Sequence, residues 1–354
     1  MRIAIDSQST LGRKTGIGLY TANLLRALRR VAPEHEYVEL AWGCTEELRV
    51  DRRLRWEQWE LPRRARAARA QVLHLTGFGA PLWRPCPTVL TVHDLIGYLF
   101  PAHLPPMARL YWAHWLPFSV RFAGRIIADS EHTRRDLERL LGVPPQRITV
   151  IPLAADERFR PVADPGALAA ARARYDLPLP FVLYVGTLEP RKGLDTLLDA
   201  FAALAGEFPH ALVIAGKRGW YTEPLFRRVE RLGLGRRVRF TDYVADEALP
   251  ALYSLADLFV FPSRYEGFGL PPLEAMACGV PVISSHAASL PEVVGDAGVL
   301  VPPDDPQALA AAMREVLTDE ARRAEMRARG LARARRFSWE ETARRTVKVY
   351  EEAT

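Results

Sequence analysis

The strongest constraint on the fold is a regular alternation of apolar runs and helical segments from Phe181 onward. The run FVLYVG (181–186) is apolar throughout, as expected of a strand that is covered on both faces. Leu194, Leu197 and Phe201 follow at the spacing of one helical stripe. Further apolar runs of strand length lie at 211–216, 238–243, 257–263, 280–285 and 298–303. Strands joined by helical crossovers predict a parallel, doubly wound sheet.

The N-terminal half follows the same pattern less regularly. Its apolar runs of strand length lie at 2–6, 36–41, 71–75, 88–94, 125–130 and 147–152. A chain of 354 residues is long for a single core. We therefore expect an α/β protein with two Rossmann-like, doubly wound parallel-sheet lobes that face a cleft. The expected domains are residues 1–165 and 178–337, and the Pro-, Ala- and Arg-rich stretch 155–180 is the candidate linker.

Composition and charge exclude several classes of protein. No apolar run approaches the roughly 20 residues that cross a bilayer. Asp6 interrupts the first residues too early for a secretory signal, so we expect a cytoplasmic protein. Cys44, Cys86 and Cys278 lie far apart without nearby histidines, which argues against a zinc site or a disulfide framework. The net charge of +6 fits an anionic substrate or an anionic surface.

The most informative stretch for function is SRYEGFGLPPLEAMACGVPVISS, residues 263–285. A strand ends at Ser263, a loop carries Glu266 between glycines and aromatic residues, and prolines open a helix near 271–278. Free N–H groups and the helix dipole make such a helix start suitable for phosphate. Glu266 and Glu274 would be repelled by phosphates, so they are better placed to accept hydrogen bonds from sugar hydroxyls. This stretch predicts a binding site for a sugar linked to phosphate.

These residues resemble the family 4 glycosyltransferases, which have the two-lobed GT-B fold. The segment EGFGLPPLEAMACGVPVI matches the Glu-x7-Glu signature of that family. The match extends through VGTLEPRKGLDTLLDAF, VRFTDYVADEALPALYSLADLFVFPS and SLPEVVGDAGVLVPP, and more weakly through TGIGLYTANLL, TVHDL and DSEHTRRDL. By analogy with this fold, residues 338–354 form a final helix that crosses back to the N-terminal domain.

The resemblance implies a retaining, metal-independent hexosyltransferase that uses a nucleotide-diphosphate sugar as co-substrate and needs no cofactor. It assigns Glu266 and the backbone of Phe268, Gly269 and Leu270 to the donor sugar and phosphate, Glu274 to the ribose, and Lys192 to the diphosphate. Many relatives carry an arginine where this chain has Thr187. The full set of implied donor-binding residues is Gly16, Gly18, Thr187, Arg191, Lys192, Tyr243, Val244, Glu266, Gly267, Phe268, Gly269, Leu270 and Glu274.

Metal independence also has an argument from the residues themselves. No two aspartates are separated by one residue, so the D-x-D ligand pair of manganese-using sugar transferases is absent from the sequence. The negative charge that develops on the leaving diphosphate must then be stabilised by cations and helix N-termini. We name His93, Lys192 and Glu266 as the catalytic candidates, and we expect no metal site.

The identity of donor and acceptor stays open at this stage. The resemblance to bacterial mannosyltransferases favours mannose from GDP-mannose, passed to a hydroxyl of a glycan or a lipid-linked acceptor. The alternatives are a UDP-sugar-dependent glycosyltransferase, an epimerase or phosphorylase on the same fold, and a non-enzymatic two-lobed sugar-binding protein. Nucleic acid is not an expected partner.

Three features of the N-terminal half are candidates for function. Gly16 and Gly18 precede the first helix, and the resemblance makes this turn part of the donor site. His93 ends the strand TVLTVHD, where it can contact sugar or acceptor. The aromatic segment 107–122 and the basic cluster Arg63, Arg64, Arg66 and Arg69 indicate peripheral contact with the inner face of a membrane, or otherwise a packed helix and a solvated loop.

Overall fold

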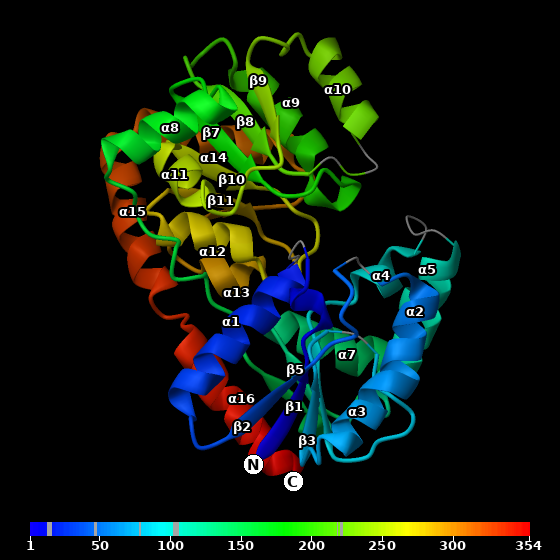
Figure 1. The fold of residues 1–354 in the computed structure, drawn as a ribbon. Coiled ribbons are helices and arrows are strands. Elements are labelled where there is room, and N and C mark those ends of the chain that lie inside the picture. Colours follow the sequence, from blue (N-terminus) through cyan, green and yellow to red (C-terminus); the bar gives the residue numbers. More distant parts are fainter. Residues whose placement is uncertain (13–15, 46–47, 78, 102–105, 218, 220–221) are drawn as a thin grey trace. The chain divides into compact units, whose positions relative to one another are not determined.

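The computed structural model describes residues 1–354 except 13–15, 46–47, 78, 102–105, 218 and 220–221. The chain divides into two compact units (Figure 1). The first unit contains Met1–Leu153 and Ser338–Thr354, and the second contains Ala154–Phe337. In the described residues, no helix combines the length and the apolar character needed to span a membrane.

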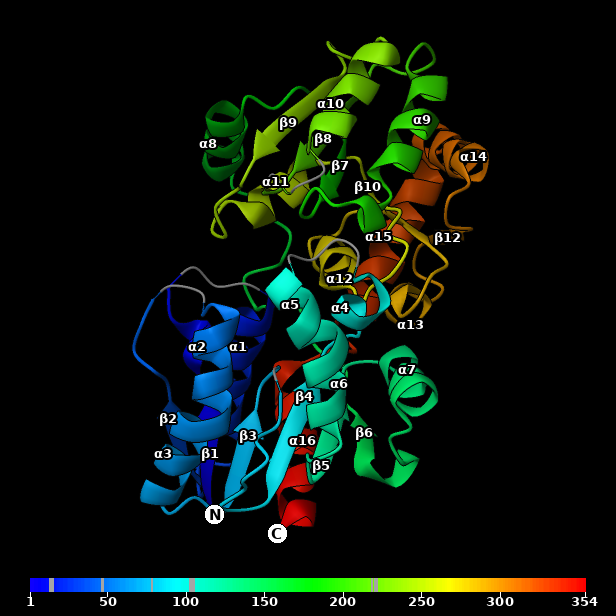
Figure 2. The same cartoon turned by 90° about the vertical axis from the view of Figure 1, so that its right-hand side faces the viewer.

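The first unit is built on a six-stranded parallel sheet in the order β2-β1-β3-β4-β5-β6 (Figure 2). Its strands are β1 Arg2–Asp6, β2 Glu36–Leu40, β3 Val72–Leu75, β4 Thr88–Val92, β5 Arg125–Ala128 and β6 Ile148–Val150. Its helices are α1 Gly16–Val31, α2 Val50–Arg55, α3 Leu61–Ala67, α4 Ile96–Leu99, α5 Pro106–Leu110, α6 Leu116–Val120, α7 Glu131–Leu141 and α16 Trp339–Ala353. Single π-helical segments, Trp56–Glu60 and Tyr111–Trp115, join α2 to α3 and α5 to α6.

The second unit holds another six-stranded parallel sheet, in the order β12-β11-β10-β7-β8-β9. Its strands are β7 Phe181–Val185, β8 Ala211–Ala215, β9 Val238–Asp242, β10 Leu258–Phe261, β11 Val282–Ser285 and β12 Val299–Val301. Its helices are α8 Pro165–Tyr175, α9 Leu194–Leu204, α10 Thr222–Arg231, α11 Leu249–Leu255, α12 Leu270–Ala277, α13 Leu290–Val294, α14 Pro306–Thr318 and α15 Glu320–Ala334. The two doubly wound parallel sheets predicted from the sequence are confirmed.

The last helix, α16, packs on the first unit. It runs beside α1 (Figure 1), and its Tyr350 hydroxyl lies 2.7 Å from Nδ1 of His74 in β3. The Thr342 hydroxyl donates to the carbonyl of Pro152 at 2.8 Å. Tyr350 is fully buried, so the C-terminal residues belong to the core of the first unit.

Residues 154–180 differ from the expected linker. Residues 154–165, which the sequence pattern placed in the first domain, belong to the second unit. Residues 165–175 form α8, because the Asp164 carboxylate accepts hydrogen bonds from the N–H groups of Gly166 and Ala167 and Pro165 fixes the first turn. The composition of this stretch suggested a linker, but its N-cap and proline start a helix that packs against α11.

A candidate sugar-phosphate site in the second unit

The second unit reverses its strand order between β7 and β10, which are hydrogen-bonded neighbours. Ligands of open α/β sheets bind at such a switch point, outside the carboxyl ends of the strands. The chain that leaves β7 carries Lys192, and the chain that leaves β10 carries Glu266. Two segments that are far apart in the sequence therefore meet at the position where the topology favours a ligand.

Glu266 is the centre of a buried charge cluster. Its Oε1 atom accepts hydrogen bonds from Lys192 Nζ at 2.6 Å, Arg191 Nη1 at 3.1 Å and Ser263 Oγ at 2.5 Å. Its Oε2 atom accepts from no donor among the described residues. Glu266 and Lys192 are only 9% and 7% exposed. The sequence assigned them to different parts of a ligand, whereas the structure pairs them with each other.

Burial and ion pairing have opposite effects on the pKa values of Glu266 and Lys192. Burial alone would raise the pKa of Glu266, but the adjacent Lys192 and Arg191 outweigh it and hold that pKa below its ordinary value. Burial also lowers the pKa of Lys192, and the Glu266 carboxylate offsets part of this effect. The Lys192 ammonium lies 5.3 Å from the centre of the Phe261 ring, which adds a cation–π contact.

The turn that carries Lys192 is fixed against the end of β10. Gly193 has φ +66°, and a Cβ at this position would lie 2.0 Å from the carbonyl oxygen of Pro262. The Arg264 N–H donates to the carbonyl of Arg191 at 2.7 Å. The Arg264 guanidinium also binds the carboxylate of Asp195, with contacts of 2.8 and 3.0 Å. A glycine and an arginine thus hold the two strand-end segments together.

The loop between Glu266 and α12 brings backbone donors to the same place. Gly269 has φ +120°, and a Cβ there would lie 2.9 Å from Leu290 Cδ2, so only glycine fits without a shift. The Ser289 hydroxyl lies 2.8 Å from the Glu266 carbonyl and 2.6 Å from the Phe268 carbonyl. The N–H groups of Phe268, Gly269 and Leu270 donate to no acceptor in the described part of the chain. Such donors at a helix start suit an anion.

Glu274 lies in the second turn of α12 and is half-buried. Its Oε2 atom accepts a hydrogen bond from the Tyr253 hydroxyl at 2.9 Å. Burial raises the pKa of Glu274 to about 7, although the hydrogen bond from Tyr253 lowers it. This carboxyl group can therefore change its charge near neutral pH, unlike Glu266.

Three more predicted residues of the second unit follow β7 or β9. Thr187 follows β7 and is half-buried, and a Cβ on Gly219 would lie 3.4 Å from its Cγ2 atom. Tyr243, after β9, is 46% exposed, and its hydroxyl lies 3.1 Å from Asp246 Oδ1. Val244 is buried. None of these residues has a hydrogen bond to the Glu266 cluster among the bonds of the described residues.

The candidates of the first unit gather around Gly77, just after β3. A Cβ on Gly77 would lie 3.0 Å from Ile17, which stands between Gly16 and Gly18, and 3.1 Å from the His93 ring. His93 Nδ1 lies 2.6 Å from Asp129 Oδ2, and Nε2 lies 3.0 Å from the Thr76 carbonyl. Both acceptors favour the imidazolium form. Burial alone would lower the pKa of His93, but Asp129 outweighs it and raises that pKa.

Several residues that shape these sites were not identified from the sequence. They are Ser263, Arg264, Ser289 and Tyr253 in the second unit, and Asp129 in the first. All five lie inside the quoted motifs. The available signal for Ser263, Arg264 and Asp129 was their position just after a strand. Among the described residues, no group of three His, Cys, Asp or Glu side chains is arranged to hold a metal ion.

Comparison with known proteins identifies the relatives of this chain. The family model for glycosyl transferases group 1 matches residues 172–333, and the model for glycosyltransferase family 4 matches residues 15–159. The O-antigen chain mannosyltransferase B of Escherichia coli is 40% identical over 265 residues, which cover 74% of this chain and 69% of that protein.

Two further comparisons, one of sequence and one of structure, differ in the share of the relative that they cover. The serotype-specific mannosyltransferase WbdA of Escherichia coli is 36% identical over 274 residues, which cover 75% of this chain and 33% of that protein. The matched region therefore spans about a third of that relative. The solved structure of sucrose-phosphate synthase from Thermosynechococcus elongatus superimposes with a TM-score of 0.75 at 25% identity, covering 99% of this chain and 98% of that one.

Proposed function

This chain belongs to glycosyltransferase family 4, and we propose that it transfers mannose from GDP-mannose with retention of configuration and without a metal ion. The proposed acceptor is a hydroxyl group of a glycan or of a lipid-linked glycan. Family membership makes the chain a hexosyltransferase, so the non-enzymatic sugar-binding alternative is dropped. The choice of mannose is supported by two mannosyltransferase relatives at 36–40% identity.

The observation that carries the proposal is the cluster of Lys192, Arg191 and Glu266 at the β7–β10 switch point. As the bond between sugar and nucleotide breaks, negative charge develops on the diphosphate. Two cations and the free N–H groups at the start of α12 are fixed in advance where this charge would form. We propose that they stabilise the leaving group and so perform the task of a metal ion.

Glu266 has two functions in this proposal. Its Oε1 atom orients the two cations, and its Oε2 atom is left to accept hydrogen bonds from donor sugar hydroxyls. Because the pKa of Glu266 is held low, the carboxylate stays ionised and remains an acceptor at neutral pH. We propose that Glu274, in its ionised form, accepts hydrogen bonds from the ribose hydroxyls.

A donor screen tests the proposal. The purified chain is incubated with GDP-mannose, GDP-fucose, UDP-glucose or UDP-N-acetylglucosamine and with cell-extract glycans, and nucleotide release and product mass are measured. We expect product formation with GDP-mannose, no loss of rate with EDTA, and an α-linked product by NMR. Activity with UDP-glucose alone would reject GDP-mannose as the donor. Loss of activity in EDTA, or a β-linked product, would reject metal independence or retention, respectively.

A further inference from the structure

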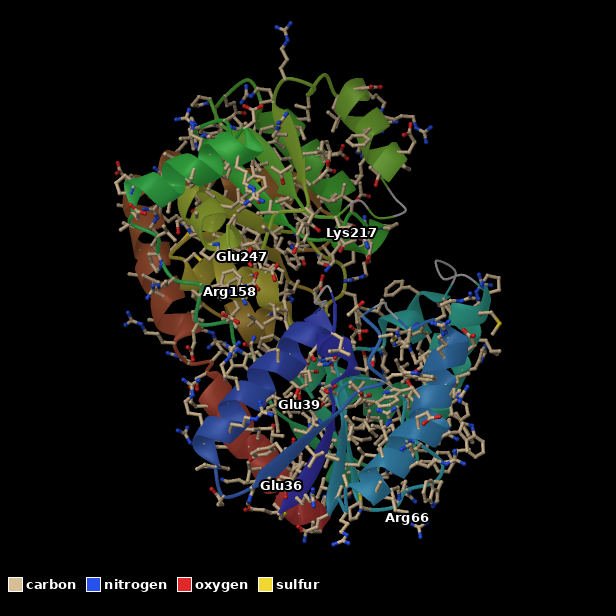
Figure 3. The ribbon with its side chains drawn as sticks, viewed as in Figure 1. Glu36, Glu39, Arg66, Arg158, Lys217 and Glu247 are labelled. Carbon is tan, nitrogen blue, oxygen red and sulfur yellow. The ribbon has the colours of Figure 1, made fainter. Side chains whose placement is uncertain are left out.

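Two helical segments of the first unit expose side chains in regular stripes. The first runs from α2 through Trp56–Glu60 to α3. Five of its exposed residues follow each other at spacings of three and four, so they lie along one face of the helix. They are Arg52, Arg55, Trp59, Arg63 and Arg66, and Asp51, Arg64 and Ala67 are exposed outside this stripe. Figure 3 labels Arg66 on the outside of α3. This stripe consists of arginine with one central tryptophan, whose ring lies 5.9 Å from the Arg63 guanidinium.

The second segment runs from α5 through Tyr111–Trp115 to α6 and shows the same spacing with apolar side chains. Its exposed stripe consists of Met107, Leu110, His114 and Phe118 and is followed by Arg121 just after α6, while Pro106 and Arg109 are exposed beside it. Met107 and Leu110 are each 58% exposed, and Phe118 is 46% exposed. In a helix that faces a protein core these positions would be buried. The apolar stripe is instead turned outward.

An apolar groove lies between the two segments. Its volume is about 350 Å³, and the residues that line it include Val50 and Leu54 of α2 and Leu110, Trp115 and Phe118 of the second segment. The loop that follows β3 exposes Leu82 and Trp83 next to the first segment, where the Leu82 N–H donates to the Gln58 side chain at 3.0 Å. Of the eight exposed large apolar side chains in the described residues, six belong to these segments and this loop. The apolar exposure is concentrated on one face.

The same part of the chain carries an excess of positive charge. Residues 50–128 contain eleven arginines, no lysine and four acidic residues, Asp51, Glu57, Glu60 and Asp94, of which Glu57 is buried. Arg84 and Arg109 sit beside the exposed apolar residues of the loop and of α5, and both are exposed. The surface therefore combines protruding apolar side chains with guanidinium groups that can bind phosphate oxygens.

We propose that this face docks the protein on an anionic lipid surface, with the apolar stripe inserted among the acyl chains and the arginines bound to headgroup phosphates. Trp59 and Trp83 have the amphipathic rings that favour the boundary between lipid and water. A second copy of the chain fits this face poorly, because a symmetric contact would bring arginines together. The proposal goes beyond the proposed function, since an enzyme of either donor specificity could carry such a face.

Vesicle co-sedimentation with the full chain tests the inference. We expect binding to phosphatidylcholine vesicles that contain phosphatidylglycerol, weak binding to phosphatidylcholine alone, and a decrease with salt. An arginine near an anionic surface contributes roughly fivefold to partitioning, so R63Q/R66Q should lower the partition coefficient by about 25-fold. L110S/F118S should also lower it, without changing the melting temperature. As a matched control, R231Q/R236Q removes two exposed arginines of the second unit and should bind like the wild type.

Three results would overturn the inference. The first is equal binding to both kinds of vesicle, and the second is unchanged binding of R63Q/R66Q and L110S/F118S. The third is a lipid-free dimer in sedimentation velocity that L110S/F118S dissociates, which would assign the face to a second copy. None of these substitutions touches the Glu266 cluster, so donor-dependent nucleotide release should stay at the wild-type rate in all of them.

Discussion

Replacing Lys192 by methionine tests two roles of the buried charge cluster, its effect on the rate of transfer and its effect on the stability of the fold. Methionine keeps most of the side-chain volume over the Phe261 ring and removes the ammonium that contacts Glu266 Oε1 at 2.6 Å. If Lys192 stabilises the leaving diphosphate, losing one such contact should lower kcat by about 10²- to 10³-fold. The structure also predicts an effect on stability, because Lys192 is 7% exposed and pairs with a buried carboxylate.

The size of the stability effect follows from the partners that remain. Removing one member of a buried ion pair typically costs about 3–5 kcal/mol. Arg191 and Ser263 still donate to the same oxygen at 3.1 and 2.5 Å, so we expect a smaller loss of about 1–2 kcal/mol. For a unit of this size the melting temperature should fall by about 5 °C. The double variant K192M/E266Q removes both charges and should recover part of this loss while kcat stays low.

The assays are nucleotide release at saturating donor and thermal unfolding of the same preparations. Lys348→Met is the matched control, because Lys348 is exposed on α16, and both readouts should stay at wild-type values. A K192M enzyme with kcat within threefold of the wild type would remove Lys192 from the site. Strictly additive melting temperatures in the double variant would show that the 2.6 Å contact contributes no coupling energy.

Three further predictions concern single residues. The pKa of Glu274 is about 7, so titration calorimetry should show that the affinity for GDP falls as the pH drops through 7. The E274Q variant should lose this pH dependence. The same pH profile in the wild type and in E274Q would refute the assignment of Glu274 to the ribose. Asp129→Asn should lower the pKa of His93, measured from imidazole NMR shifts, so that the imidazolium and the stability it confers are lost at lower pH than in the wild type. An unchanged His93 titration would contradict the pairing. Gly269→Ala should destabilise the protein by about 1–3 kcal/mol and reduce nucleotide release, since φ +120° and Leu290 leave no room for a methyl group; wild-type melting and rate would refute this.

The sequence predicted the fold class and the strand-end position of the site, but not the pairings inside it. Periodicity identifies buried strands and crossover helices, and the carboxyl ends of such strands are where ligands bind. The sheet orders could not be read, because pairing depends on contacts between distant segments. For the same reason the ion pair of Lys192 with Glu266 was not foreseen.

That pairing changes an expectation about stability. From the sequence, replacing Lys192 should leave the thermal midpoint nearly unchanged, as for a cation in a flexible loop. Its burial under the Glu266 carboxylate makes a measurable loss the better expectation. At Asp164 the local signal was present in the sequence but was outweighed. Asp164 and Pro165 are a helix N-cap and a first-turn proline, yet the composition of the stretch suggested a linker.

The packing of α16 on the first unit has a consequence for biosynthesis. The ribosome delivers residues 1–153 early, but Tyr350 and its neighbours, which complete that core, emerge only after the whole second unit. The intervening chain takes roughly 10–40 s to make at 5–20 residues per second. Throughout this interval the nascent first unit displays the apolar surface that α16 will cover, whereas the second unit has all its parts before α16 is made. A transcript that stops early therefore produces a polypeptide that chaperones and proteases can recognise as incomplete.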